Sequence, residues 1–212
     1  KHGGKVSVIS MGPPQAEAVI REAYMMGADE GVLMSDRRFA GADTLATAYT
    51  LAQGIKRLGD FDLIVTGMQT TDGDTAQVGP GIAELLEIPY VAYVRRVHDS
   101  YPDRLLVEQD MADTYEVVEV SCPCLITVTK EVNVPRLPSY RKKLETKDKP
   151  ITVWSMDDLE ECDETSCGLK GSPTQVERIF PPEVNVEKTV LRGTGEELGK
   201  AVYEKLKELR FV

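Results

Sequence analysis

The sequence is poor in the residues that usually carry acid–base or metal chemistry. Only two of its 212 residues are histidine, His2 and His98. Histidine is the side chain whose charge changes most readily near neutral pH, and it is also the commonest metal ligand. We therefore expect no catalytic acid or base and no metal centre in this chain.

Long hydrophobic runs are also absent. A helix that crosses a bilayer needs about 18 or more consecutive apolar residues, and no such run occurs. The first residues also lack the charged and apolar regions of a secretory signal. We expect a cytoplasmic protein with no direct insertion into a membrane.

Positive charge is in short supply. Lys and Arg total 25 against 35 Asp and Glu, so the formal net charge is −10 and the isoelectric point is near 4.8. Proteins bind nucleic acid largely by neutralising its phosphates with Lys and Arg. The charge balance therefore argues against nucleic acid as a partner.

The four cysteines form two pairs, Cys122-Pro-Cys124 and Cys162-x4-Cys167. On a strand, Cys122 and Cys124 point to the same face, which makes a disulfide between them awkward. A four-thiolate zinc site made from both pairs is an alternative, although the spacings are not those of a zinc ribbon. Reduced, buried thiols in an intracellular protein are the preferred interpretation.

Hydrophobic patterning predicts alternating strands and helices. The order of these elements predicts a doubly wound, mostly parallel α/β sheet with its ligand at the carboxyl ends of the strands. The motifs of P-loop ATPases and adenylating pyrophosphatases are absent. We expect strands at 5–11, 31–34, 61–66, 104–110, 114–122 and 124–129, and helices at 15–26, 39–54 and from 195 to about 210.

Residues 61–97 have the pattern strand, loop, helix, strand. Asp74 and Gln77 have the spacing of a capping box, which predicts a helix start near Thr75. Gly79 and Gly81 fall in the first turns of that helix, where each costs about 0.5–1 kcal/mol relative to Ala. Two interpretations remain open: a phosphate-bearing ligand approaches the backbone here, or the glycines permit close packing.

A second candidate segment is the start of the helix at 39–54. Asp43 is a plausible N-cap for this helix. Thr44 and Thr47 lie three residues apart at its open end, so both hydroxyls face one way and could donate to a phosphate. The alternative is that Thr44 only supports the cap and Thr47 is solvated.

The segment GMQTTDGDTAQVGPGIAELLEIPY resembles the signature of the electron-transfer flavoprotein β subunit. In that family a Gly-x-Gln segment, an Asp-Gly-Asp-x-x-Gln-x-Gly loop and a Pro-led strand surround an adenine nucleotide. The likeness runs from Lys5 to about Val212, and it implies a Rossmann-like fold of the adenine nucleotide alpha hydrolase type. Family members carry a further strand, loop and helix before the position of Lys1.

The resemblance also implies a set of cofactor-binding residues. Gly-Ala-Asp-Thr-Leu-Ala-Thr is similar to the version in bifurcating complexes, whose β subunit binds FAD; the simple version binds AMP and lacks the threonine pair. The extra pyrophosphate of FAD needs extra donors. The residues implied are Met11, Gly12, Asp43, Thr44, Thr47, Gly67, Gln69, Thr71, Asp72, Gly73, Asp74, Thr75, Gln77, Gly79 and Pro80.

For function, the resemblance implies one half of a heterodimer with an α subunit that carries a second FAD. NADH would be the electron donor. One electron would go to ferredoxin or flavodoxin and the other, through the α subunit, to an acyl-CoA dehydrogenase-type enzyme. A non-bifurcating β subunit with structural AMP is the alternative. A stress-protein-like ATP-binding regulator is a third hypothesis, which the long C-terminal segment and the basic loop oppose.

Two further segments are expected to contact partners. Residues 134–146 are basic and punctuated by proline; by default they are a solvated connector, but the resemblance implies a docking loop using Leu137, Tyr140, Arg141 and Lys142. We expect a nucleotide-binding α/β domain over 1–150 that includes this loop. Residues 151–212 are expected to form an arm that wraps the partner subunit, because the segment alone would bury little apolar surface.

Overall fold

The computed structural model describes residues 3–181 and 190–211. Their contacts group the chain into two units, Lys1–Gln175 and Val176–Val212. Each unit is described by itself.

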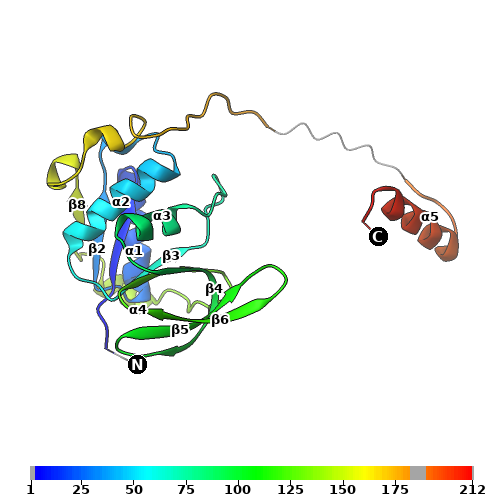
Figure 1. Ribbon diagram of the computed structural model, residues 1–212, viewed down its shortest axis with the longest axis horizontal. Coiled ribbons are helices and arrows are strands. Elements are labelled where there is room, and N and C mark those ends of the chain that lie inside the picture. Colours follow the sequence, from blue (N-terminus) through cyan, green and yellow to red (C-terminus); the bar gives the residue numbers. More distant parts are fainter. Residues whose placement is uncertain (1–2, 182–189, 212) are drawn as a thin grey trace. The chain divides into compact units, whose positions relative to one another are not determined.

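The first unit contains a three-stranded parallel sheet in the order β1-β2-β8. Helix α1 packs on one of its faces through Ile20 and Tyr24, which contact Leu33 of β2. The neighbouring residues Val32 and Met34 point to the opposite face, where helix α2 lies (Figure 1). The predicted βαβ start is therefore confirmed. The elements are β1 (Ser7–Met11), a 3₁₀ turn (Pro14–Ala16), α1 (Glu17–Met26), β2 (Glu30–Met34), α2 (Thr44–Leu58) and β8 (Thr152–Trp154).

A second, five-stranded sheet has the order β3-β7-β4-β5-β6. Strands β3, β7 and β4 run parallel, while β5 and β6 form the predicted antiparallel hairpin beside β4. The mixed α/β fold with mostly parallel core strands is confirmed, although its strands belong to two sheets. Their bounds are β3 (Leu63–Gly67), β4 (Tyr90–Ser100), β5 (Arg104–Asp110), β6 (Tyr115–Ser121) and β7 (Cys124–Val128).

Helix α2 connects the cores of the two sheets. On one side its residues pack with Met34 of β2, and on another Ala48 and Ile55 pack with α3 (Val78–Leu85) and Leu125 of β7. Gly54 allows the close approach, since a Cβ there would lie 2.4 Å from the sulfur of Met34. Figure 1 shows α2 and α3 next to each other in front of the strands.

The division between the units differs from the expected division after residue 150. Residues 151–175 stay with the first unit because β8 joins its sheet and because Met156, Leu159 and Cys167 are buried in one of its cores. This stretch contains 3₁₀ turns at Met156–Asp158 and Glu164–Ser166.

The second unit contains the predicted C-terminal helix, α5 (Gly195–Glu208). Its start is fixed by a capping box in which Thr194 Oγ1 accepts from the amide of Glu197, and Glu197 accepts from the amide of Thr194. That this unit wraps a partner subunit stays a prediction. Within the described ranges, no helix has the length and apolar character needed to cross a bilayer.

Candidate functional site

The N-terminus of α2 is held by Asp43, as predicted. Asp43 Oδ1 accepts from the amides of Leu45 and Ala46 at 3.0 and 3.1 Å, and Oδ2 accepts from the amide and hydroxyl of Thr174 at 3.1 and 2.8 Å. Partial burial opposes ionisation, but these four donors outweigh it and lower the pKa of Asp43. The cap is a carboxylate with its acceptor capacity filled by the protein.

Thr44 connects α2 with the segment before α3. Its Oγ1 donates to Gln77 Oε1 over 3.1 Å. Thr47 lies one turn further along α2, and both threonines are half-buried. Since Asp43 supplies the cap, Thr44 is free for this longer-range contact. The structure thus brings together two predicted site residues that are 33 positions apart.

The loop between β3 and α3 is tied together by its own side chains. Gln69 Nε2 donates to Asp74 Oδ1, and Asp72 Oδ1 accepts from the amide of Gly73 at 2.8 Å. The hydroxyl of Thr70 and this amide lower the pKa of Asp72. Both carboxylates therefore serve the conformation of the loop.

The helix start predicted near Thr75 is wrong. Asp74 and Ala76 adopt positive φ angles of 52° and 55°, a left-handed conformation that cannot continue into a right-handed helix. Helix α3 begins at Val78, and its N-cap residue Gln77 makes no side-chain capping bond. The predicted capping box of Asp74 and Gln77 does not form, because the first side chain binds Gln69 and the second accepts from Thr44.

The structure assigns different roles to the glycines of this segment. A Cβ at Gly79 would lie 2.6 Å from Thr127 Cγ2, and one at Gly81 would lie 3.0 Å from Ala48 Cβ. Close packing therefore explains both, and the half-buried Pro80 lies between them in the first turn of α3. Gly67 is exposed, and a Cβ there would meet nothing within 4 Å. Backbone open to a ligand is thus found at Gly67 and in the following loop, where Thr71, Gly73 and Thr75 are exposed.

One residue of this region was not predicted. The hydroxyl of Thr66, at the carboxyl end of β3, is buried without a hydrogen-bond partner and lies beside Gly79. Unpaired buried hydroxyls are uncommon, and a functional role is one of the explanations for them. The sequence feature that could have pointed to Thr66 is its position at the end of a predicted strand, directly before Gly67.

Met11 is the last residue of β1 and Gly12 follows it, and both are half-buried. The amide of Gly12 donates to the carbonyl of Met34 at the end of β2 over 3.0 Å. These residues lie at the carboxyl end of the first sheet, whereas Gly67 lies at the carboxyl end of β3 in the second. The position of both segments at strand ends is the one expected for a ligand site in this fold class.

The predicted docking segment contains the short helix α4 (Tyr140–Glu145), capped by Ser139. Leu137 and Tyr140 are 88% and 75% exposed. Arg141 and Lys142 both pair with Glu145, at 2.7 and 3.6 Å. The segment therefore presents apolar side chains among basic ones.

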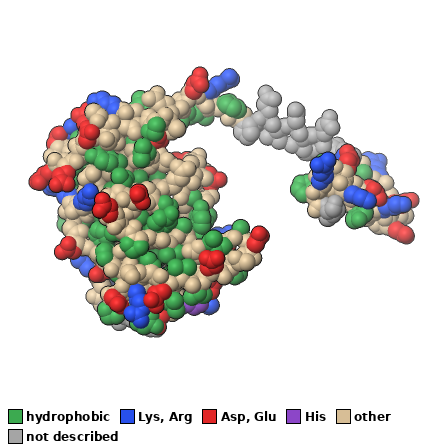
Figure 2. All heavy atoms as spheres, in the orientation of Figure 1, with side chains coloured by type: hydrophobic (Ala, Val, Ile, Leu, Met, Phe, Trp, Pro, Cys, Tyr) green, Lys and Arg blue, Asp and Glu red, His purple; other side chains and the backbone are tan. Residues whose placement is uncertain are grey.

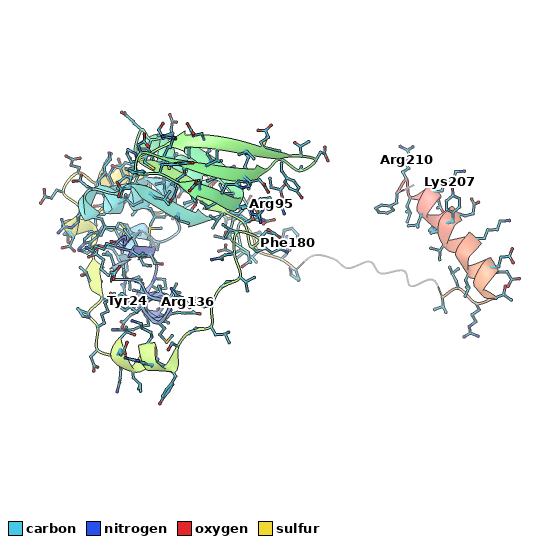
Figure 3. All side chains as sticks on the ribbon, turned by 90° about the horizontal axis from the view of Figure 1, so that it is seen from below. Tyr24, Arg95, Arg136, Phe180, Lys207 and Arg210 are labelled. Atoms are coloured by element: carbon cyan, nitrogen blue, oxygen red, sulfur yellow. The ribbon has the colours of Figure 1, made fainter. Side chains whose placement is uncertain are left out.

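Arg136 precedes α4 and reaches the C-terminal end of α1. Its Nη2 lies 3.4 Å from the position of a Cβ on Gly27; Figure 3 labels Arg136 and also Tyr24 of α1. Tyr24 in turn donates a 2.7 Å hydrogen bond to the carbonyl of Pro150. Arg136 of the docking segment thus lies near the end of α1, and the chain just after the segment is bonded to α1 at Pro150.

The cysteine pairs lie in different places. Cys122 and Cys124 belong to the core formed by β4 to β7, whereas Cys162 and Cys167 belong to the core around Met34. Consistent with this separation, no group of three or more potential metal ligands occurs among the described residues. The geometry gives no support to the four-thiolate zinc alternative.

Comparison with known proteins identifies the family. The family model for the electron transfer flavoprotein domain matches residues 1–159. The electron transfer flavoprotein subunit beta of Clostridium acetobutylicum is 48% identical over 211 residues, which cover 100% of this chain and 80% of that protein. This chain belongs to the electron transfer flavoprotein β-subunit family. The family membership predicted from the 67–90 signature is therefore confirmed.

Two other relatives of this β subunit have more specific names. The caffeyl-CoA reductase-Etf complex subunit CarD of Acetobacterium woodii is 45% identical over 213 residues, covering 99% of this chain and 80% of that protein. Protein FixA of Azorhizobium caulinodans is 42% identical over 198 residues, which cover 90% of this chain and 70% of that protein. Since β subunits of electron transfer flavoproteins pair with an α subunit, the partner expected for this chain is of that kind.

Proposed function

We propose that this β subunit binds FAD and takes part in electron bifurcation from NADH. One electron goes to ferredoxin or flavodoxin and the other, through the α subunit, to an acyl-CoA dehydrogenase-type enzyme. The observation that carries the proposal is the pair Thr44 and Thr47 at the N-terminus of α2, with Thr44 in contact with Gln77.

The chemistry of this corner suits a dinucleotide phosphate. The N-terminus of a helix carries partial positive charge, although in α2 the amides of Leu45 and Ala46 are taken by Asp43. Two half-buried hydroxyls lie one turn apart beside it. Thr47 adds a neutral donor, and Thr44 would exchange its bond to Gln77 for one to the ligand. The exposed backbone at Gly67 and Gly73 leaves room for a ligand to approach. Together these groups offer more donors than a single phosphate needs, and their number suits a pyrophosphate.

The unpaired hydroxyl of Thr66 adds to the fit. It lies where β3 ends and the open loop begins, next to Gly79. The strand ends at Met11 and Gly67 then line the nucleotide, with Met11 on the adenine side.

The reaction itself belongs to the flavin, which when bound accepts a hydride and passes on single electrons. The residues of this chain hold the cofactor, orient it and set its electrostatic surroundings. No catalytic acid or base is assigned to them. The similarity to the CarD subunit supports this interpretation, because that protein's name places it in a reductase complex acting on a CoA thioester.

The partner proposals rest on exposed surface. Large hydrophobic side chains of the second sheet are exposed, among them Val65, Tyr90 and Tyr115 at 56%, 48% and 60%, and Figure 2 shows hydrophobic side chains gathered across the first unit. Such patches commonly mark protein interfaces, so we assign this surface to the α subunit. Leu137, Tyr140, Arg141 and Lys142 are assigned to the dehydrogenase partner.

The test is to co-express the chain with its α subunit and to count the nucleotides released per heterodimer. We expect two FAD. One FAD and one AMP would instead support the alternative, a non-bifurcating β subunit that relays electrons between acyl-CoA dehydrogenases and the α-subunit FAD. Absence of any adenine nucleotide on this chain would contradict both.

A further inference from the structure

Cys162 and Cys167 have no part in the proposed nucleotide site, yet their thiols are in direct contact. The two Sγ atoms lie 3.2 Å apart. Cys167 is 1% exposed, whereas Cys162 is half-buried and closer to solvent. A buried thiol next to an accessible one is the arrangement in which the outer sulfur attacks a disulfide first and the inner sulfur then resolves the mixed disulfide.

We propose that Cys162 and Cys167 are a redox-responsive dithiol that a small-molecule disulfide converts into an intramolecular disulfide. In the first step, Cys162 attacks the disulfide, a mixed disulfide forms and one small thiol leaves. In the second, Cys167 attacks the Cys162 sulfur and the second small thiol leaves. Both cysteine protons end on the two released thiols, so two protein thiols are oxidised and one small disulfide is reduced.

The pair lies at the start of a strap, residues 162–174, that supports the N-terminus of α2. Within the strap, the hydroxyl of Ser172 accepts from the amide of Asp43 at 2.8 Å, and Thr174 donates to the Asp43 carboxylate. The amide of Leu169 donates to the carbonyl of Ala40 at 3.0 Å. A crosslink between Cys162 and Cys167 would therefore stiffen the element that holds the α2 cap.

The strap is closely packed, so the thiols have little freedom to separate. A Cβ on Gly168 would lie 2.0 Å from the carbonyl oxygen of Arg38, and one on Gly171 would lie 2.1 Å from the carbonyl carbon of Ser166. Thr50, on α2, also donates toward Cys167 Sγ at 3.4 Å. Bond formation needs the sulfurs to move from 3.2 Å to about 2.05 Å, which rotation of the more exposed Cys162 side chain can supply.

Burial, the neighbouring thiol and the carboxylate of Asp163 raise the pKa of Cys162 to about 12, against the opposing charge of Arg38. Thiolate is then scarce at neutral pH, so the exchange is slow. Thiols of high pKa are also poor leaving groups, so reduction of the disulfide is slow as well. The dithiol therefore responds to sustained oxidation.

The test is to incubate the folded chain with bis(2-hydroxyethyl) disulfide, block the remaining thiols and map the tryptic peptides by mass. Both members of each pair stay in one peptide, residues 105–130 for Cys122 and Cys124 and residues 148–170 for Cys162 and Cys167. We expect the 148–170 peptide to lose two hydrogens and the 105–130 peptide to carry two blocked thiols. We also expect the melting temperature to rise by about 2–8 °C on oxidation.

Cysteine variants separate the two pairs and the two steps of the exchange. The C122S/C124S variant should behave like the parent chain, whereas C167S should stop at the mixed disulfide on Cys162. A mixed disulfide that persists on Cys162 in the parent chain, or oxidation of the 105–130 peptide instead, would overturn the proposal. The proposal would also be overturned if the folded chain stayed reduced, with two blocked thiols in each peptide, under conditions in which the same reagent oxidises the urea-unfolded chain. The parent chain alone distinguishes these outcomes, so the test does not depend on any variant folding.

Discussion

Thr44 and Gln77 are joined by a 3.1 Å hydrogen bond from the threonine hydroxyl to the amide oxygen. The bond connects the first turn of α2 with the residue before α3, and these two helices pack along each other through Ala48 and Gly81. The bond therefore fixes the separation between the start of α2 and the residue before α3, and this corner is where we place the nucleotide.

Replacing Thr44 with valine should open this corner. The T44V variant loses the bond to Gln77, so we expect unfolding free energy to fall by about 0.5–1.5 kcal/mol and nucleotide content of the heterodimer to fall with it. Denaturant unfolding and counting of released nucleotides measure the two effects. T44S keeps the hydroxyl and is the matched control. Combined T44V/T47V with unchanged flavin content would contradict the role of both hydroxyls.

The packing role of Gly79 predicts a large effect of one methyl group. G79A places a Cβ 2.6 Å from Thr127 Cγ2 and 2.8 Å from Thr66 Oγ1, so we expect a loss of about 1–3 kcal/mol in unfolding free energy. G67A is the control, because a Cβ there meets nothing within 4 Å. Equal stability of the two variants in urea would refute the packing role.

Asp36 predicts a pH effect. Its side chain is 12% exposed and accepts from Arg38 and from the amide of Met156, and these bonds, the one from Arg38 foremost, hold its pKa far below the usual value. A depressed folded-state pKa stabilises the protein above the unfolded pKa of about 3.9 and loses that effect as the pH falls further.

We therefore expect D36N to be less stable than the parent at pH 7 by about 1–3 kcal/mol. The difference should shrink as the pH falls below about 4. Urea unfolding at a series of pH values measures it. D103N is the control, since the Asp103 side chain is 74% exposed. A stability difference that stays constant down to the lowest pH would show that ionisation of Asp36 is not the cause.

The docking segment predicts a loss of coupling without a loss of stability. Leu137 and Tyr140 are 88% and 75% exposed, so L137A/Y140A should melt like the parent and retain its nucleotide. Electron transfer to the dehydrogenase should slow by about tenfold or more, the size expected when an interface anchor is truncated. V19A removes an exposed apolar side chain from α1 and should leave the rate unchanged. Equal rates for both variants would place docking elsewhere.

Local patterns were sufficient for most elements of the fold. The alternation in 104–122 predicted the β5–β6 hairpin, and Asp43 predicted the start of α2, because period and capping depend on neighbouring residues alone. The motif around Gly67 was sufficient for the family, which the relatives confirm. These features need no knowledge of distant contacts.

Tertiary structure decided the rest. Asp74 and Gln77 have capping-box spacing, but each side chain found a different partner, Gln69 and Thr44, and backbone at positive φ delayed the helix to Val78. Close approach of α2 and β7 explains Gly81 and Gly79, and no local pattern reports that proximity. Spacing along the chain says which bonds are available, whereas which of them form depends on the side chains that packing brings near, and the contact of Cys162 with Cys167 was fixed in the same way.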